Sequence, residues 1–171
     1  VADGYTLLLG GSASMSINPS LHKNLPYDPI KDFAPISLVG IAPHILAVHP
    51  SLAARTAKDL IEIAKAQPGK LNLASTGIGT PVHLAGELFK SMAGVDMQQI
   101  QYKGGGPGYI GLLSGEASVC FCGLASARPF LKDKLRGLAV TSAKRTATLP
   151  EMPTVAESGL PGYEVVGWYS I

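Results

Sequence analysis

Apolar residues recur with the spacing of an amphipathic helix in two segments near the middle of the chain. The first segment begins at Thr56, which stands three residues before Asp59 as in a capping box, and it stops at a Pro-Gly pair. The second begins at Thr80, a favoured N-cap residue that is followed by proline, and it ends at Gly94. The apolar stripes of these two predicted helices are Ala57, Leu60, Ile61 and Ala64, and Ala85, Leu88, Phe89 and Met92.

Short apolar runs bounded by turn residues predict strands around these helices. The predicted strands cover residues 5–9, 33–39, 45–48, 71–74, 98–102, 117–121, 138–141 and 163–171. Pro43 separates the second strand from the third, and a further short helix is predicted over residues 107–113. Because strands and helices alternate through the middle of the chain, we expect an α/β fold with a mostly parallel sheet covered by helices.

Three further predictions concern residues outside this alternation of strands and helices. Residues 18–35 contain four prolines, and we expect them to be irregular apart from a helical turn around residues 19–22. Thr154 and Glu157 have capping-box spacing and predict a short helix closed by Gly159. Trp168 is expected in the core rather than in the wall of a pocket.

Two glycine-rich turns, over residues 75–80 and 102–108, lie at the carboxyl ends of predicted strands, where open α/β sheets collect ligands. Each turn leads into a helix whose first N–H groups are unpaired and carry partial positive charge, which favours anions. In a parallel sheet the two turns emerge at the same edge, and their helices face one pocket suited to a carboxylate. The alternative is a pair of ordinary turns, because every βα connection needs a turn and turns use glycine.

The first turn does not match the common nucleotide-binding patterns. Gly77 and Gly79 form a G-x-G pair without the third glycine of a dinucleotide fingerprint, and no acidic residue closes the next strand for a ribose contact. No G-K-[S/T] sequence follows, which excludes a phosphate-binding loop. We therefore expect no cofactor.

The composition narrows the class of partner. Hydrophobic residues make up 46% of the chain and charged residues 15%, and the net charge is +2. Lys and Arg are scattered, so nothing indicates binding to nucleic acid or to an anionic membrane surface. No apolar run approaches the length that spans a bilayer.

Cysteine and histidine give few candidates for catalysis. Cys120 and Cys122 stand two positions apart in a predicted strand; taking their side chains to point to opposite faces, we expect neither a disulfide nor a metal site. His44 and His49 flank a strand, whereas His83 lies in the first turn of its helix and is either a ligand contact or a surface residue. Cys122 with His83 is conceivable as nucleophile and base. No Ser-His-Asp order or carboxylate pair is recovered, so we expect a binding protein and no enzyme.

Motifs along the whole chain resemble those of the tripartite tricarboxylate transporter receptors, the Bug or TctC-like family of extracytoplasmic solute-binding proteins. The matching strings are DGYTLLLG at residues 3–10, INPSL at 17–21, NLPYDPIKDFAPISLV at 24–39, PGKLNLASTGIGTPVHLAGELFKSMAGVD at 68–96, YKGGGPG at 102–108 and LAVTSAKRTATLPEMPTVAESGLPGYEVVGWY at 138–169. The resemblance implies a two-lobed, periplasmic-binding-protein-like (Venus flytrap) fold with the ligand in the cleft.

The resemblance also implies a truncated chain, because family members are longer and begin with a signal peptide. We accordingly expect a signal peptide upstream and a periplasmic location. Residues 1–41 would be part of lobe 1 with the first interlobe crossing, residues 42–138 lobe 2, and residues 139–171 the return crossing with part of lobe 1. The implied ligand contacts are Gly11, Ser12 and Ala13 in lobe 1, and Ser75, Thr76, Gly77, Gly79, Thr80, His83, Tyr102, Lys103, Gly104, Gly105 and Cys122 in lobe 2.

One departure from the family bears on the ligand. Where the family often has an aspartate and then an asparagine, this chain has Cys122 and Gly123. An acid there would accept a hydrogen bond from a ligand amino group, so we expect a di- or tricarboxylate or an aromatic acid and not an amino acid. The resemblance implies a monomeric receptor that delivers this acid to the membrane permease subunits of a tripartite tricarboxylate transporter. The alternatives are a receptor read by a membrane signalling protein, and an enzyme that uses Cys122.

Overall fold

The computed structural model describes residues 4–131 and 133–171, and the sequence predictions are compared with it over those residues. Within them a seven-stranded sheet has the order β1-β7-β2-β5-β3-β4, and β6 also pairs with β2. The strands are β1 (Gly10–Gly11), β2 (Leu38–Val48), β3 (Asn72–Ser75), β4 (Gln98–Gln101), β5 (Val119–Gly123), β6 (Arg136–Val140) and β7 (Val166–Ser170). The helices are η1 (Ala13–Ile17, a π-helix), α1 (Asn18–Leu21), α2 (Ala57–Ala66), α3 (Pro81–Ala93), α4 (Gly105–Leu113), α5 (Leu124–Ala127) and η2 (Arg128–Phe130, a 3₁₀-helix).

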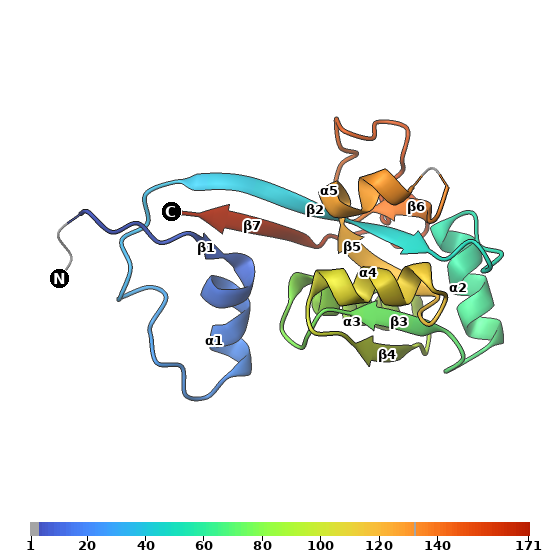
Figure 1. The fold of residues 1–171 in the computed structure, drawn as a ribbon, viewed down its shortest axis with the longest axis horizontal. Helices are drawn as coiled ribbons and strands as arrows, with labels where there is room; N and C mark the ends of the chain where they lie inside the picture. Colours follow the sequence, from blue (N-terminus) through green and yellow to red (C-terminus); the bar gives the residue numbers. More distant parts are fainter. Residues whose placement is uncertain (1–3, 132) are drawn as a thin grey trace.

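The long strand β2 joins two parts of the sheet. Its residues 38–43 pair with β7, whereas its residues 44–48 pair with β5 and residues 45–48 also pair with β6. Figure 1 shows β2 and β7 running side by side from the helix-covered part of the molecule toward β1 and α1. The predicted break at Pro43 is therefore wrong. Proline has no N–H to donate, but the strand stays continuous because Pro43 stands where β2 exchanges one partner for another.

Strand directions also differ from the predicted, mostly parallel sheet. Among the described strands, β3 is parallel to both of its neighbours, β4 and β5. The pairings of β2 with β5, β6 and β7, and of β1 with β7, are antiparallel. Strands and helices alternate from β2 to β6, yet only β3, β4 and β5 pair in parallel. Alternation alone therefore does not determine the direction of the crossing strands.

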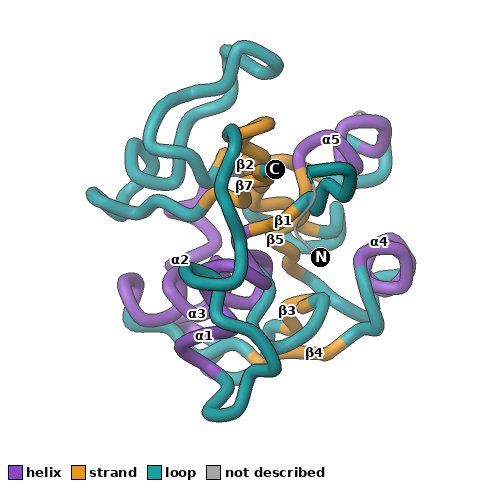
Figure 2. Tube along the Cα trace, turned by 90° about the vertical axis from the view of Figure 1, so that its left-hand side faces the viewer, coloured by secondary structure: helices purple, strands orange, loops and turns teal. Residues whose placement is uncertain are grey.

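Two hydrophobic clusters cover opposite faces of the helix-covered part of the sheet. On the face of α2 and α3, the rings of Phe89, Phe121 and Tyr163 pack together with centroids 5.6 to 6.4 Å apart. On the face of α4 and α5, Leu112 packs with Ile45 and with the sulfur-bearing residues of β5. Figure 2 shows α3 and α4 on the two sides of β3.

The two long helices begin and end where the sequence predicts. Thr56 and Asp59 form a capping box at the start of α2, with both reciprocal hydrogen bonds present. Thr80 Oγ1 accepts a hydrogen bond from the backbone N–H of His83 at the start of α3. Gly94 ends α3 with φ of 62°, a left-handed conformation that glycine adopts without strain. The predicted helical turn near residues 19–22 is also confirmed, as α1.

The predicted buried strand over residues 5–9 is wrong. Leu7, Leu8 and Leu9 are 51% to 65% exposed, and pairing with β7 begins only at Gly10. The apolar run itself gave the prediction, but burial needs a neighbouring layer, and the described residues provide none over this segment.

Two predictions near the carboxyl end are wrong in part. Thr154 and Glu157 exchange the two hydrogen bonds of a capping box, each of 3.0 Å, yet the residues that follow form a turn and no helix. Trp168 is half-buried and lines an apolar groove of about 490 Å³ beside Ile36 and Ile41, so it belongs to a pocket wall and not to the core.

Candidate functional site

The turn after β3 is shaped by two glycines and a capping threonine. Gly77 and Gly79 have φ of 122° and 81°. Thr80 Oγ1 donates to the Gly77 carbonyl oxygen at 2.8 Å and lies 3.3 Å from Thr76 Oγ1. A Cβ atom on Gly79 would lie 2.7 Å from Leu21 Cδ1, so glycine lets α1 approach this turn closely.

The turn after β4 lies beside the first one. The two strands are parallel with Ser75 opposite Gln101, and Tyr102 N donates to the Ser75 carbonyl oxygen at 2.8 Å. Gly104, with φ of 99°, then leads directly into α4. The prediction that both turns emerge at one edge of the sheet is confirmed.

A cavity of about 140 Å³ opens where these turns meet the end of β5. Its lining joins the first turns of α3 and α4 to residues from β3 and β5. The lining residues are Ala74, Thr76, Val82, Gly105, Gly108, Tyr109, Cys120, Phe121, Cys122 and Gly123. None of these ten residues carries a charge near neutral pH, so a ligand here would meet backbone N–H groups, a hydroxyl and apolar walls.

The structure brings together only some of the predicted site residues. Thr76, Gly105 and Cys122 line the cavity. Ser75 does not line the cavity, because it points to the opposite face of β3 from Ala74, which does. Gly11, Ser12 and Ala13 lie in the amino-terminal segment, at β1 and the start of η1. The other predicted residues surround the cavity without lining it, namely Gly77, Gly79, Thr80, His83, Tyr102, Lys103 and Gly104.

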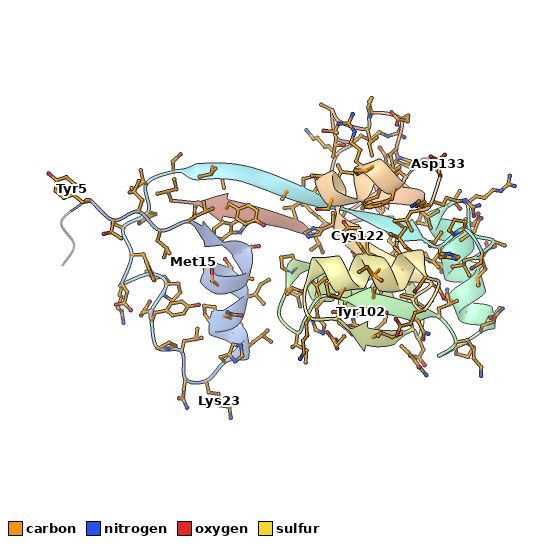
Figure 3. All side chains as sticks on the ribbon, in the orientation of Figure 1. Tyr5, Met15, Lys23, Tyr102, Cys122 and Asp133 are labelled. Carbon is orange, nitrogen blue, oxygen red and sulfur yellow. A yellow bond between two sulfur atoms is a disulfide. The ribbon has the colours of Figure 1, made fainter. Side chains whose placement is uncertain are left out.

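The aromatic residues of α4 and its preceding turn stiffen this region. Tyr109 OH donates to the Gly123 carbonyl oxygen at 3.0 Å, and burial raises the pKa of its phenol, which therefore stays protonated. The Tyr102 ring packs against α4 at Gly111, and burial together with the Glu116 carboxylate raises the pKa of Tyr102. Figure 3 marks Tyr102 and Cys122 on either side of α4.

Cys120 and Cys122 form a disulfide in the wall of the cavity. The prediction that they stay apart is wrong, because residues two positions apart in a strand share a face and only adjacent residues alternate. Both sulfurs are in this bond, so Cys122 offers no thiolate nucleophile in this structure.

Buried polar atoms without a hydrogen-bond partner among the described residues gather near the same edge. They include His44 Nδ1, Ser75 Oγ and His83 Nδ1. His44 is 8% exposed, and burial lowers its pKa, which keeps the ring neutral. Sequence reasoning placed His44 only beside a strand, and no motif distinguishes it.

The described residues contain no group of three or more His, Cys, Asp or Glu side chains arranged to hold a metal ion. Over the same part of the chain, every helix is too short or too polar to cross a membrane.

The fold and the cavity together define an α/β protein with an uncharged, anion-favouring site at the carboxyl edge of its parallel strands. The family model described as "Tripartite tricarboxylate transporter family receptor" matches residues 1–171. The chain belongs to this family. Because it is a family of receptors, the prediction of a binding protein and no enzyme is confirmed.

Individual relatives agree with this assignment. Protein BugT of Bordetella pertussis is 35% identical over 172 residues, which cover 99% of this chain and 53% of BugT. The solved structure "R. palustris Rpa4515 with adipate" is 36% identical with a TM-score of 0.92, covering 99% of this chain and 57% of that one. "MatC (Rpa3494) from Rhodopseudomonas palustris with bound malate" is 26% identical with a TM-score of 0.86, covering 99% and 58%.

These likenesses confirm the periplasmic-binding-protein-like fold. The chain spans about half the length of the curated relatives it matches.

Proposed function

We propose that the protein containing this chain is a periplasmic receptor that captures a small carboxylate and delivers it to a tripartite tricarboxylate transporter. The observation that carries the proposal is the convergence of two βα turns on one uncharged cavity, in a chain of this receptor family. The solved relatives with adipate and malate support a carboxylic acid as the ligand.

The carboxylate would be held chiefly by backbone groups. Helices α3 and α4 both start at this edge, and their first N–H groups favour an anion. The hydroxyl of Thr76 would add a donor from inside the cavity, and Lys103, exposed in the turn after β4, would add charge at the rim. In this role Ser75, Gly77, Gly79, Thr80, His83, Tyr102, Gly104 and Gly105 would form or support the two turns.

The lobe assignment belongs to the same proposal. Lobe 2 would comprise residues 42–138, and residues 1–41 and 139–171 would be parts of lobe 1 and the two crossings. The change of partner along β2 between Pro43 and His44 supports a boundary near residue 42. Gly11, Ser12 and Ala13 would then face the ligand from lobe 1.

The lining of the cavity favours an acid without an amino group. An ammonium group is held best by a carboxylate, and the cavity contains none among its lining residues. At the end of β5 the side chain is the disulfide-bonded Cys122, followed by Gly123. Di- or tricarboxylates and aromatic acids therefore fit better than aspartate or glutamate.

A thermal-shift and calorimetric screen of the full-length protein tests this function. The panel contains malate, adipate, citrate, benzoate and aspartate. We expect saturable binding of at least one acid without an amino group, and saturation at 100 times the dissociation constant adds about 2.7 kcal/mol of stability. Binding of aspartate alone would refute the ligand class, and binding of none would refute the receptor function.

A matched pair of threonine variants locates the site. Thr76→Val removes the hydroxyl in the cavity, whereas Thr148→Val removes one from an exposed turn residue that does not line the cavity. We expect weaker binding only for Thr76→Val, by about fivefold to tenfold for one lost hydrogen bond. Uptake of the same acid by cells with and without the receptor gene tests delivery to the transporter.

A further inference from the structure

We propose that His44 is a further ligand contact, a neutral hydrogen-bonding group placed at the junction of the two lobes. The inference rests on the proposed receptor function and adds a residue that neither glycine-rich turn contains. Three observations support it: the position of the His44 backbone, the direction of its ring, and the absence of a hydrogen-bond partner for Nδ1 among the described residues.

The backbone of His44 is fixed beside the cavity. It is the first residue of β2 to pair with β5, and its partner there is Gly123, which lines the cavity. His44 N donates to Thr141 Oγ1 at 3.0 Å, and Thr141 donates back to the His44 carbonyl oxygen from Oγ1 at 3.1 Å and from N at 2.9 Å. Since Thr141 is fully buried, these three bonds hold the backbone of His44 in place.

The ring of His44 faces the amino-terminal segment. A Cβ atom on Gly167 would lie 3.5 Å from His44 Cε1 and 3.8 Å from Ser12 Oγ. The imidazole and the Ser12 hydroxyl therefore flank the same stretch of β7. His44 thus pairs through its backbone with the cavity residue Gly123 and directs its ring toward β7 and Ser12, which is the position of a group clamped between the two proposed lobes.

The Nδ1 atom of this ring is buried and makes no hydrogen bond within residues 4–131 and 133–171. A buried polar atom without a partner is unfavourable, and buried side-chain nitrogens are nearly always bonded. Ser75, which is 1% exposed at the same edge of the sheet, also has a side-chain oxygen, Oγ, without a hydrogen-bond partner among the described residues. An oxygen of a bound acid would accept a hydrogen bond from an N–H at His44 Nδ1, and the neutral imidazole carries one such donor.

Calorimetric titration of the full-length protein tests the inference, using the acid that binds in the screen above. The variants are His44→Leu, which removes the polar atoms, His44→Asn, which keeps one near the place of Nδ1, and His49→Leu. His49 lies beyond the other end of β2 against Ser51 and serves as the matched control. We expect affinity to fall about tenfold for His44→Leu and less than about threefold for His44→Asn, with no change for His49→Leu.

The outcomes separate this inference from the receptor function. Equal affinity of the wild type and His44→Leu overturns the role of His44 while the receptor function stands. Failure of the wild type to bind any acid overturns both. If His44→Leu does not fold, the ¹⁵N resonance of His44 Nδ1 in the wild type decides, assigned by its loss in His44→Asn. A shift at ligand saturation supports the contact, and an unchanged resonance overturns it.

Discussion

Alanine substitutions at two glycines of α4 test how closely this helix packs against Tyr102 in the turn that precedes it. Gly106 is exposed in the first turn, and a Cβ atom there would have nothing within 4 Å. Gly111 is buried, and a Cβ atom there would collide with the Tyr102 ring, with Cε1 at 2.8 Å. Alanine at either position reduces the freedom of the unfolded chain equally, so the two variants differ mainly in the contact with Tyr102.

The magnitudes follow from these surroundings. Gly106→Ala should raise the free energy of unfolding by about 0.5–1 kcal/mol, the usual gain of alanine over glycine in a helix. Gly111→Ala has the same gain but overpacks a buried site, which costs about 1–3 kcal/mol. Tyr102 cannot yield as a flexible aliphatic chain would, because its ring is rigid and its backbone N–H is bonded to β3. Gly111→Ala should therefore be about 1–3 kcal/mol less stable than Gly106→Ala.

Urea unfolding followed by far-UV circular dichroism measures this difference, provided that the denaturant slope is the same in both variants. The same pair in a Tyr102→Ala background is the control. Without the ring, the two alanines should have nearly equal effects. Equal stability of Gly106→Ala and Gly111→Ala in the wild-type background would refute the reasoning, and so would a difference that survives the loss of Tyr102.

Three further variants test local features of the fold. Tyr163→Phe removes the buried bond to the Ala85 carbonyl oxygen and should lower the free energy of unfolding by about 1–2 kcal/mol in urea titrations. Thr80→Ala removes the cap of α3 and should lower it by about 1 kcal/mol, with Thr148→Ala as an exposed control. The hydrogen bond from the backbone N–H of Thr154, followed by the contact with Arg145, lowers the pKa of Glu157 below its usual 4.5. The Glu157 carboxylate therefore contributes stability above that pH, and this contribution is lost as the pH falls through the lowered pKa. Glu157→Gln should flatten the acid limb of a plot of stability against pH, and an unchanged limb would contradict this.

The parts of the fold that follow from local chemistry are predictable from sequence. Thr56 with Asp59, and Thr80 with Gly94, place the ends of α2 and α3 because capping depends on residues only a few positions apart. The two glycine-rich turns are predictable for the same reason. Their meeting at one edge required only that β3 and β4 be parallel, which the intervening helix implies.

Features that depend on distant neighbours are not predictable in this way. Nothing near Pro43 in the sequence indicates that β2 changes partner there, because the partners are β5 and β7. The exposure of Leu7 depends on which layer covers it and not on its hydrophobicity. The surroundings of His44 are formed by Thr141 and Gly167, which lie about 100 residues or more away in the sequence, so no local pattern indicates its role. The disulfide of β5, by contrast, is compatible with the local sequence, because residues two positions apart in a strand share a face.

The position of the crossing strands explains why a receptor of this kind would place ligand contacts near its hinge. Among the described strands, β2 and β7 connect the two parts of the sheet, and they are paired at Ala42 with Gly167. Gly167 has no side chain, and the Ala42 carbonyl oxygen and His44 Cε1 each lie 3.5 Å from the place of its missing Cβ, at ordinary contact distance. In the proposed receptor, a rotation of the lobes would be absorbed at this point. An acid that contacts Ser12 on one side and the turn at Thr76 on the other would restrict the rotation most effectively near this crossing point. Small displacements at a hinge correspond to large displacements at the lobe tips. Ligand affinity and closure would then depend on the same few contacts, and in this proposal His44 would be one of them.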